Sequence, residues 1–387
     1  MKNSIAILLF IIAELLSANA VAASVWNQKP NLPAVGRHRG TGIAIANKGY
    51  FGLGHVNGTG VNVVYSDWWE YDPATASWTQ KADVPVQTYG AAAFASSTAG
   101  YIGGGIFQDD EFYRFDPALN TWTQVADAPV HVNDNIAFCV GDFGYITDGT
   151  ELYEYNTIND TWTQKQTPPT NIGLWSSATV LQNSAYIKTG SNFYEYKPTS
   201  DTWIVKQSYP GIATGGGVAF VINNKCYFLL GYGGSLGNVQ KEMYEFDPAT
   251  GNWTVQPEFP GTSRRFSCGF AINNKGYIGI GTNGINFSDF WEYNRLLSTD
   301  EIPTQTTISV TTFPCPAINF INFKIIDSEK FKELTISIYN SLGQKQEELD
   351  YINSGSTLSL AKYPSGFYFY SIHSNQSLVT TGQFLKR

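Results

Sequence analysis

The sequence predicts an all-β protein in which a closed ring of short antiparallel strands precedes a small second β domain. Aromatic residues make up 15% of the 387 residues and stand beside 37 Gly and only 2 Met, a usage typical of short strands joined by tight turns. A unit that recurs six times, and array ends that complement each other, predict the ring. The low charged fraction of 14% argues against a disordered or coiled-coil protein, and the net charge of -8 gives no general attraction for nucleic acid, so we expect no nucleic-acid partner.

The first 23 residues have the features of a secretory signal peptide. Lys2 gives a positive start, an apolar stretch covers residues 5–16, and small residues follow up to Ala23, which we prefer to Ala20 and Ala22 as the cleavage site. The apolar stretch is too short to cross a bilayer, and no later segment approaches spanning length. The sequence therefore predicts an exported protein with no transmembrane segment.

Six similar segments divide the middle of the chain into units. They are WNQKPNLP, WTQKADVP, WTQVADAP, WTQKQTPP, WIVKQSYP and WTVQPEFP, and each opens with a Trp that is followed seven residues later by Pro. A GYxxxG-like segment and then an aromatic-x-aromatic step follow each Pro, and the units recur every 40 to 50 residues. This spacing is typical of solenoids and propellers, and the four short strands of each unit match a propeller blade.

The two ends of the array predict how it closes. Tyr293 ends an aromatic step but has Asp300, not Trp, seven residues later, whereas Trp26 has no aromatic step before it. The strand around Trp26 should therefore complete the sixth unit, which removes the open sheet edges. We expect a six-bladed β-propeller over residues 24–297, closed by its N-terminal strand.

The units resemble Kelch repeats. The resemblance covers about Trp26 to Asn294 and depends on the glycine-ended second strand and on Tyr and Trp at a fixed separation. The paired glycines typical of that family are present only at Gly103-Gly104 and Gly233-Gly234. The resemblance implies a Kelch-type propeller.

A polar linker over 298–306 leads to a C-terminal segment, 307–387, whose alternating strands predict a small Ig-like β-sandwich. Its strings FPCPAINFINFKI, ISIYNSLGQK and LAKYPSGFYFYSI resemble the C-terminal sorting domain of type IX secretion found in Bacteroidetes, with PCP in place of the usual PNP and a basic end reduced to Lys386-Arg387. The resemblance implies that the type IX secretion machinery is a partner. It also implies export across the outer membrane to the cell surface or the extracellular space.

The candidate site lies where the chain enters the innermost strand of each unit, four to six residues after the Pro. These positions vary most between units and should lie near one mouth of the central channel. Arginines gather there in the first and last units, which are ring neighbours, and this pattern suggests a polar funnel that holds an acidic glycan through bidentate Arg contacts and a stacking Trp. The alternative, in which the arginines cap strand ends or point into solvent, stays open. The candidate ligand-binding residues are Arg37, His38, Arg39, His131, Asp134, Trp175, Arg264 and Arg265.

The sequence favours a module that binds a glycan or a protein partner. A copper site like that of galactose oxidase would need two of His38, His55 and His131 at ligand spacing, and nothing in the sequence places them so. The four cysteines are far apart and form no CxxC pair, so we expect neither a disulfide framework nor a zinc site, and no cofactor.

An enzyme is the alternative function. The string GTGIAIANKGYFGLG is similar to the opening blade of bacterial sialate mutarotases. This similarity implies a carbohydrate isomerase, in which His131 or Asp134 could act as general acid or base beside the arginines.

Overall fold

The computed structural model describes residues 25–295, without 59, 108–109 and 213–214, and residues 310–387, without 315, 326–333, 341–344, 352–354 and 375–376. The predicted signal peptide and linker lie outside the described residues. The chain divides into two compact units, of which one covers Ala23–Leu296 and the other contains the C-terminal segment.

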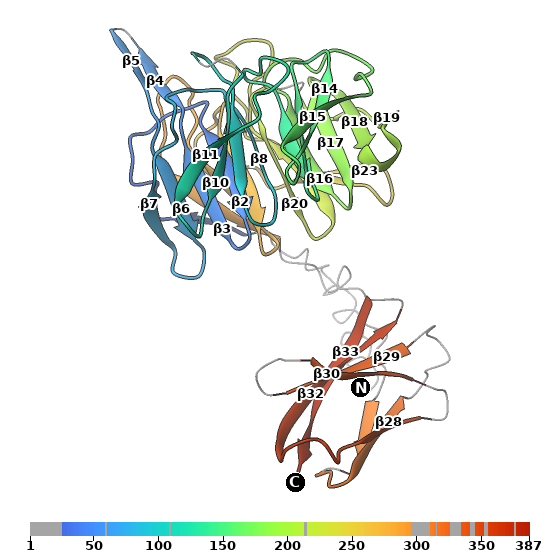
Figure 1. Cartoon of the computed structure of the whole chain (residues 1–387). Coiled ribbons are helices and arrows are strands. Elements are labelled where there is room, and N and C mark those ends of the chain that lie inside the picture. The colour runs from blue at the N-terminus through green and yellow to red at the C-terminus, as the bar shows by residue number, and fades with distance from the viewer. Residues whose placement is uncertain are drawn as a thin grey trace, which may run out of the picture. The chain divides into compact units, whose positions relative to one another are not determined.

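The described strands of the first unit form six four-stranded antiparallel sheets, which we number 1 to 6, and one two-stranded hairpin (Figure 1). Sheets 1 to 3 consist of β2 (Thr41–Ile45), β3 (Lys48–Gly52), β6 (Trp68–Asp72) and β7 (Ser77–Lys81); of β8 (Ala92–Ala95), β9 (Gly100–Gly103), β10 (Phe112–Asp116) and β11 (Thr121–Val125); and of β12 (Ala137–Val140), β13 (Phe143–Thr147), β14 (Leu152–Asn156) and β15 (Thr161–Lys165). Sheets 4 to 6 consist of β16 (Ser177–Leu181), β17 (Ser184–Thr189), β18 (Asn192–Lys197) and β19 (Thr202–Val205); of β20 (Val218–Ile222), β21 (Lys225–Leu229), β22 (Met243–Asp247) and β23 (Asn252–Gln256); and of β24 (Cys268–Ile272), β25 (Lys275–Gly279), β26 (Phe290–Asn294) and β1 (Val25–Lys29). The hairpin pairs β4 (His55–Gly58) with β5 (Val61–Val64), and one 3-10 turn covers Pro198–Ser200.

The second strand of each sheet is buried on both faces because neighbouring sheets pack against it. In β3 and β13 the residue before the Tyr is Gly49 or Gly144, and a Cβ at either position would overlap the ring of Phe270 or Phe94 from the preceding sheet. At these two positions glycine is therefore required by packing, since only a residue without a side chain leaves room for that ring.

The Glu of the aromatic-Glu-aromatic step has a structural role. Its carboxylate accepts a hydrogen bond from the Tyr hydroxyl of the second strand, as in Tyr50 to Glu70 at 2.8 Å and Tyr277 to Glu292 at 2.9 Å. The same pair recurs as Tyr145 with Glu154 and as Tyr227 with Glu245. Each buried hydroxyl thus has an acceptor within its own sheet.

The first and last strands of the unit lie side by side. β1 pairs antiparallel with β26, and Trp26 stands opposite Tyr293, as the repeat arithmetic predicted. The innermost strands contact one another in the order β2, β8, β12, β16, β20 and β24, and β24 contacts β2. This arrangement is propeller-like.

Tryptophans of the outermost strands join neighbouring sheets. Five of them donate the indole N–H to a main-chain carbonyl of the preceding sheet or the loop that follows it, at 2.9 to 3.0 Å: Trp78 to Pro30, Trp122 to Ala82, Trp162 to Ala126, Trp203 to Gln166 and Trp253 to Gln207. Trp26 packs against Phe259 and Tyr293, but its buried Nε1 has no acceptor. The contact between sheets 5 and 6 therefore lacks the hydrogen bond found at the other five.

The second unit is a two-sheet sandwich over its described residues. One sheet has the order β27 (Val310–Phe313), β28 (Phe320–Ile325), β31 (Ser356–Ser359), and the other has the order β30 (Lys345–Asp350), β29 (Leu334–Tyr339), β32 (Gly366–Ser374), β33 (Ser377–Lys386). Alternating residues of both sheets, including Phe323, Ile336 and Tyr370, form one core. The expected β-sandwich pattern is thus present.

The missing indole hydrogen bond can be measured by comparing two Trp→Phe variants. W122F removes a donor that is bonded to Ala82, whereas W26F removes a donor that has no acceptor, and both variants lose similar packing. W122F should lower the free energy of unfolding by about 1 kcal/mol more than W26F. Urea unfolding of the mature chain measures both values, and equal losses would contradict the assignment.

Candidate functional site

Six residues at one mouth of the channel form a closed cycle of main-chain hydrogen bonds, one from each sheet. Each N–H donates to the carbonyl of the equivalent residue in the preceding sheet, at 2.7 to 2.8 Å in five cases and 3.2 Å from Arg39 to Phe266. All six residues have a positive φ, between 54° and 70°. We call them the main-chain ring: Arg39, Gly90, Asp134, Trp175, Gly216 and Phe266. The ring brings the side chains of Arg39, Asp134, Trp175 and Phe266 to the channel axis.

Arg37 and Arg264, two of the candidate ligand-binding residues, form buried ion pairs within the protein. Both are almost completely buried, with 1% and 0% of their surface exposed. Each forms a two-pronged ion pair, Arg37 with Asp67 and Arg264 with Asp289, and each also donates to two main-chain carbonyls. These guanidinium groups have no free face for a ligand.

Each of these two carboxylates also accepts a hydrogen bond from a neighbouring indole. Trp69 donates to Asp67 at 2.8 Å, and Trp291 donates to Asp289 at 2.7 Å. Sheets 1 and 6 therefore share one Arg–Asp–Trp arrangement, with the Asp just before the third strand. Asp67 and Asp289 are structural partners of the two arginines that the sequence analysis did not identify.

Arg39 and Asp134 meet across the main-chain ring. The guanidinium donates from Nε to Oδ1 of Asp134 at 2.8 Å, and their side chains are 17% and 4% exposed. The Arg39 guanidinium also lies 4.9 to 5.9 Å from the ring centres of Tyr89, Phe266 and Trp175. The candidate cation of the funnel is thus already paired with an anion and surrounded by aromatic rings.

Arg265 differs from the other three arginines. Its Nη1 donates to the Leu236 carbonyl, its guanidinium lies 5.4 Å from the Phe266 ring and 6.0 Å from the Tyr232 ring, and its buried Nε has no partner. Among the described residues no carboxylate lies within ion-pair distance of it. Arg265 is therefore the one unneutralised arginine of the four.

His38 and His55 face each other beside the main-chain ring. The antiparallel register of β2 and β3 extends to a bridge between them, and their rings lie 4.2 Å apart. Both are at least 94% buried, both Nδ1 atoms have no partner, and burial lowers each pKa from 6.5 to about 4. Asn57 lies 3.2 Å from Nε2 of His38. At neutral pH both imidazoles are therefore uncharged.

Aromatic rings continue around the mouth in an unbroken series. Tyr89 stacks on His55 at 3.8 Å, His38 lies 5.8 Å from Phe266, and Phe266 lies 5.5 Å from Trp175. Tyr232 closes a triangle with Trp175 and Phe266 at 5.9 and 5.7 Å, and Phe107, which is 68% exposed, extends the series beyond Tyr89. We call this series the aromatic arc: Phe107, Tyr89, His55, His38, Phe266, Trp175 and Tyr232. Sequence analysis identified only His38 and Trp175 of it as ligand-binding residues.

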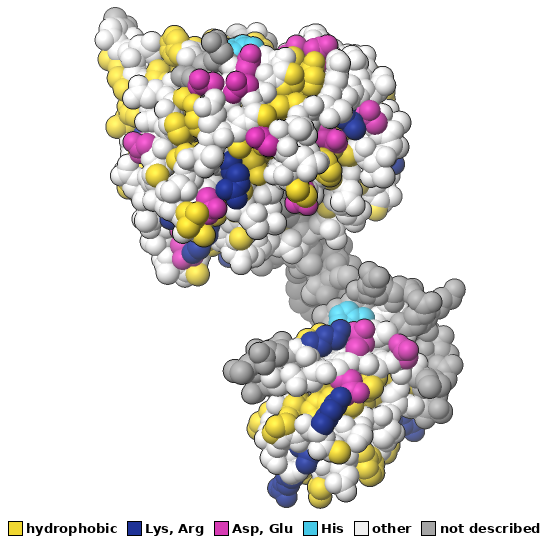
Figure 2. All heavy atoms as spheres, in the orientation of Figure 1, with side chains coloured by type: hydrophobic (Ala, Val, Ile, Leu, Met, Phe, Trp, Pro, Cys, Tyr) yellow, Lys and Arg dark blue, Asp and Glu magenta, His cyan; other side chains and the backbone are white. Residues whose placement is uncertain are grey.

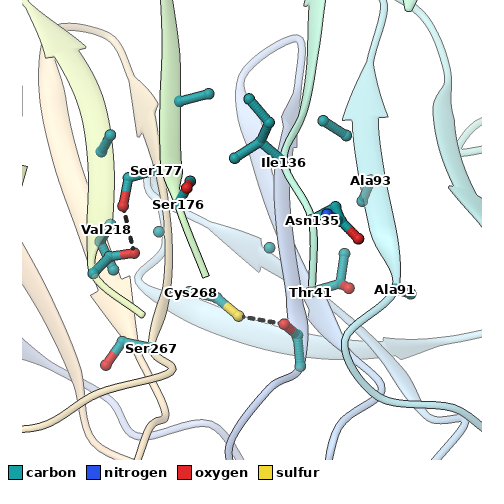
Figure 3. Close-up of a pocket in the computed structure, with 17 residues that line it drawn as sticks. Thr41, Ala91, Ala93, Asn135, Ile136, Ser176, Ser177, Val218, Ser267 and Cys268 are labelled. Carbon is teal, nitrogen blue, oxygen red and sulfur yellow. Dashed lines mark hydrogen bonds between the residues drawn. The ribbon is translucent and has the colours of Figure 1, made fainter. Parts of the chain in front are cut away.

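A cavity of about 210 Å³ occupies the channel below the main-chain ring. Figure 3 shows small side chains of the innermost strands around it, among them Thr41, Ser176, Ser177 and Cys268. The Thr41 hydroxyl and the Asn135 amide nitrogen have no hydrogen-bond partner there. The channel interior is thus narrow and polar.

His131 lies beside Asp110. Its imidazole is half exposed and lies 3.9 Å from Asp110. The described part of the chain holds no group of three His, Cys, Asp or Glu side chains that could bind a metal ion. Cys139, Cys226 and Cys268 are free thiols, and Cys315 lies outside the described residues.

Acidic side chains outnumber basic ones on the face of the first unit shown in Figure 2. Several Asp and Glu side chains lie near the His at its upper edge, with no Lys or Arg among them. No helix within the described ranges is both long and apolar enough to cross a membrane.

A solved structure entitled "Structure of YjhT" is similar to this chain. The similarity has a TM-score of 0.57 and 16% sequence identity, and it covers 68% of this chain and 96% of that one. At this identity it shows the fold alone, and it supports the propeller-like arrangement of the six sheets. No curated protein sequence matches the chain.

Residues 311–387 match the family described as "Secretion system C-terminal sorting domain". The match covers the described strands of the second unit and agrees with the resemblance found in the sequence. The protein is therefore secreted through the type IX system to the cell surface or the extracellular space.

Proposed function

We propose that this protein is a surface-delivered binding module, a six-bladed Kelch-type propeller that holds a glycan on the aromatic arc. The observation that carries the proposal is the arc itself, seven rings in contact around the mouth of the channel. Carbohydrate rings present flat faces of C–H groups, and aromatic side chains offer a rigid surface with a polar edge for such faces. The sorting domain would bring this surface to the outside of the cell, where glycans are abundant.

The arc suits recognition better than catalysis. Asp134 is paired with Arg39, and His131 is half exposed beside Asp110, so these two candidate acid–base groups do not converge on a common point of the arc. The buried imidazoles of His38 and His55 serve as walls of the site. The proposal therefore assigns no catalytic residue.

Saturation-transfer NMR on the intact mature chain tests the proposal. A pool of neutral and acidic oligosaccharides should give transfer signals, and W175A should reduce them about tenfold because one face of the arc is lost. I158A is the matched control, since Ile158 is 75% exposed in the turn between β14 and β15, at the other end of the sheets. The proposal fails if no sugar gives a signal or if W175A leaves the signals unchanged, and accelerated anomer exchange in the same spectra would indicate an enzyme.

Separate variants distinguish the structural arginines from the ligand-facing one. R264M leaves Asp289 partly buried without its cation and should lower the free energy of unfolding by about 3–5 kcal/mol. The double variant R264M/D289N should lose less, because no uncompensated charge remains, and R265Q should leave stability almost unchanged. Chemical unfolding measures all three, and a stable R264M would show that the ion pair has little structural weight.

The buried histidines predict a pH dependence of stability. Unfolded histidines take up protons near pH 6.5, whereas His38 and His55 in the folded protein resist protonation down to about pH 4. Stability should therefore fall as the pH drops from 6.5 towards 4, by up to about 2 kcal/mol per histidine at pH 5. Unfolding of the parent and of H38N/H55N at pH 7.5 and pH 5 measures the effect, and an equal pH dependence in both would contradict it.

A further inference from the structure

We propose that the ligand of the aromatic arc is an uncharged saccharide chain that lies across the mouth, and not an acidic sugar held by arginine. This inference rests on the proposed function and names its ligand class. It follows from three features of the mouth: the pairing of its charges, the half-buried aromatic rings, and the small size of the cavities beneath them.

Three of the four arginines at the mouth form ion pairs with aspartates of the protein itself. Arg37, Arg39 and Arg264 each have an aspartate partner. Arg37 and Arg264 are also almost completely buried, so a ligand cannot reach their guanidinium groups. Arg39 already uses Nε and Nη2 on Asp134, whose side chain is only 4% exposed. A second carboxylate would meet a cation that is already neutralised, and displacing Asp134 would leave a buried charge unpaired, which is strongly unfavourable. An acidic ligand therefore gains little here.

Arg265 alone does not make an acid-binding site. Its Nη1 is engaged by the Leu236 carbonyl, and its guanidinium lies against the rings of Phe266 and Tyr232. A bidentate carboxylate clamp needs an accessible fork of two donors, but Nη1 is already engaged and the unpaired Nε is buried, so a carboxylate at the mouth cannot reach a complete fork. Arg265 can instead donate hydrogen bonds to sugar hydroxyls, as neutral ligands require.

Four half-buried rings remain available on the arc, Tyr89, Phe266, Trp175 and Tyr232. Trp175, Phe266 and Tyr232 stand 5.5 to 5.9 Å apart at angles of 53° to 68°, so they form a faceted surface and not one flat stack. Exposed apolar side chains continue it outward, with Leu174, Leu236 and Ile285 at least 50% exposed in the loops beside the mouth. Such a surface suits several successive sugar rings better than one small anion.

The main-chain ring sets the depth of the site. Its six residues line a cavity of about 160 Å³, and Arg39 and Asp134 form an ion pair there. A second cavity, of about 210 Å³, lies between the innermost strands. Both are smaller than the roughly 300–1,000 Å³ of a pocket that encloses a drug-sized ligand, so a saccharide chain lies lengthwise on the arc.

Matched pairs of oligosaccharides test the charge requirement on the intact mature chain. Isothermal titration compares a hexameric galacturonan with its fully methyl-esterified form, 3′-sialyllactose with lactose, and neutral hexamers of glucose, mannose, xylose and N-acetylglucosamine. At least one neutral member should bind, and no acidic member should bind more tightly than its neutral partner. Raising sodium chloride from about 0.05 M to about 0.5 M should change the Kd of the neutral ligand less than about twofold.

Three variants locate the binding. W175A and Y232A should each weaken the neutral ligand about tenfold, and either suffices if the other does not fold. R265Q should change its Kd less than about threefold, and I158A serves as the surface control. Neutral binding that survives both aromatic substitutions overturns the inference.

Two other outcomes separate this inference from the proposed function. If only acidic members bind, and high salt and R265Q abolish that binding, the ligand class is wrong while the glycan-binding module stands. If no member binds, both proposals fall.

Discussion

The cycle of six main-chain hydrogen bonds around the channel axis is the constraint on which the mouth depends. Each bond joins equivalent residues of neighbouring sheets, so no sheet can shift radially without breaking two of them. The geometry requires the left-handed backbone conformation at every position, which is costly for Arg39, Asp134, Trp175 and Phe266 and free for glycine. The ring thus positions four large or charged side chains at the axis, where local backbone preference alone would not place them.

Charge at the mouth follows from this positioning. The ring places Arg39 and Asp134 so that they meet across the axis, and the aromatic rings beside them lower the polarity around the pair. Burial strengthens the attraction between the two ions and raises the cost of separating them. The mouth is accordingly a rigid, nearly neutral floor that offers shape and aromatic faces to a ligand more than electric field.

The repeat pattern predicted the arrangement of the strands because each recurring residue keeps one packing role in the units that contain it. The outer-strand Trp occurs in all six units, and the Tyr with a Glu partner and the glycine before Tyr each occur in four. Trp26 and Tyr293, which lack a partner in their own segments, predicted the pairing of β1 with β26. The roles of Arg37 and Arg264 were not predicted, since their partners Asp67 and Asp289 lie 30 and 25 residues away and the pair occurs in only two units. The main-chain ring could not be predicted from the sequence, because the residue type at its position differs in almost every unit.

One contact of the site could have been found from sequence. The hairpin register that pairs Thr41 with Gly52 also places His38 opposite His55 when it is extended by three residues, and the structure has this bridge. The aromatic arc as a whole could not, because Tyr232, Trp175 and Phe266 come from three sheets and depend on the angles between them. Periodicity identifies the residues that the units have in common, whereas the aromatic arc consists of residues that differ from unit to unit.

The geometry of the mouth also depends on the pairing of β1 with β26. β1 comes first in the unit and β26 last, so their pairing closes the longest loop of the unit and has the largest loop-closure cost. The bond of the main-chain ring between Arg39 and Phe266, which joins sheets 1 and 6, is also its longest, and Trp26 lacks the indole hydrogen bond found at the other five outer strands. The ladder between β1 and β26 and the packing of Trp26 against Phe259 and Tyr293 together complete sheet 6. Sheet 6 also positions Phe266, which joins His38 to Trp175 in the aromatic arc and accepts the hydrogen bond of Arg39. The geometry of the mouth is thus set in part by the strand that completes the sixth sheet.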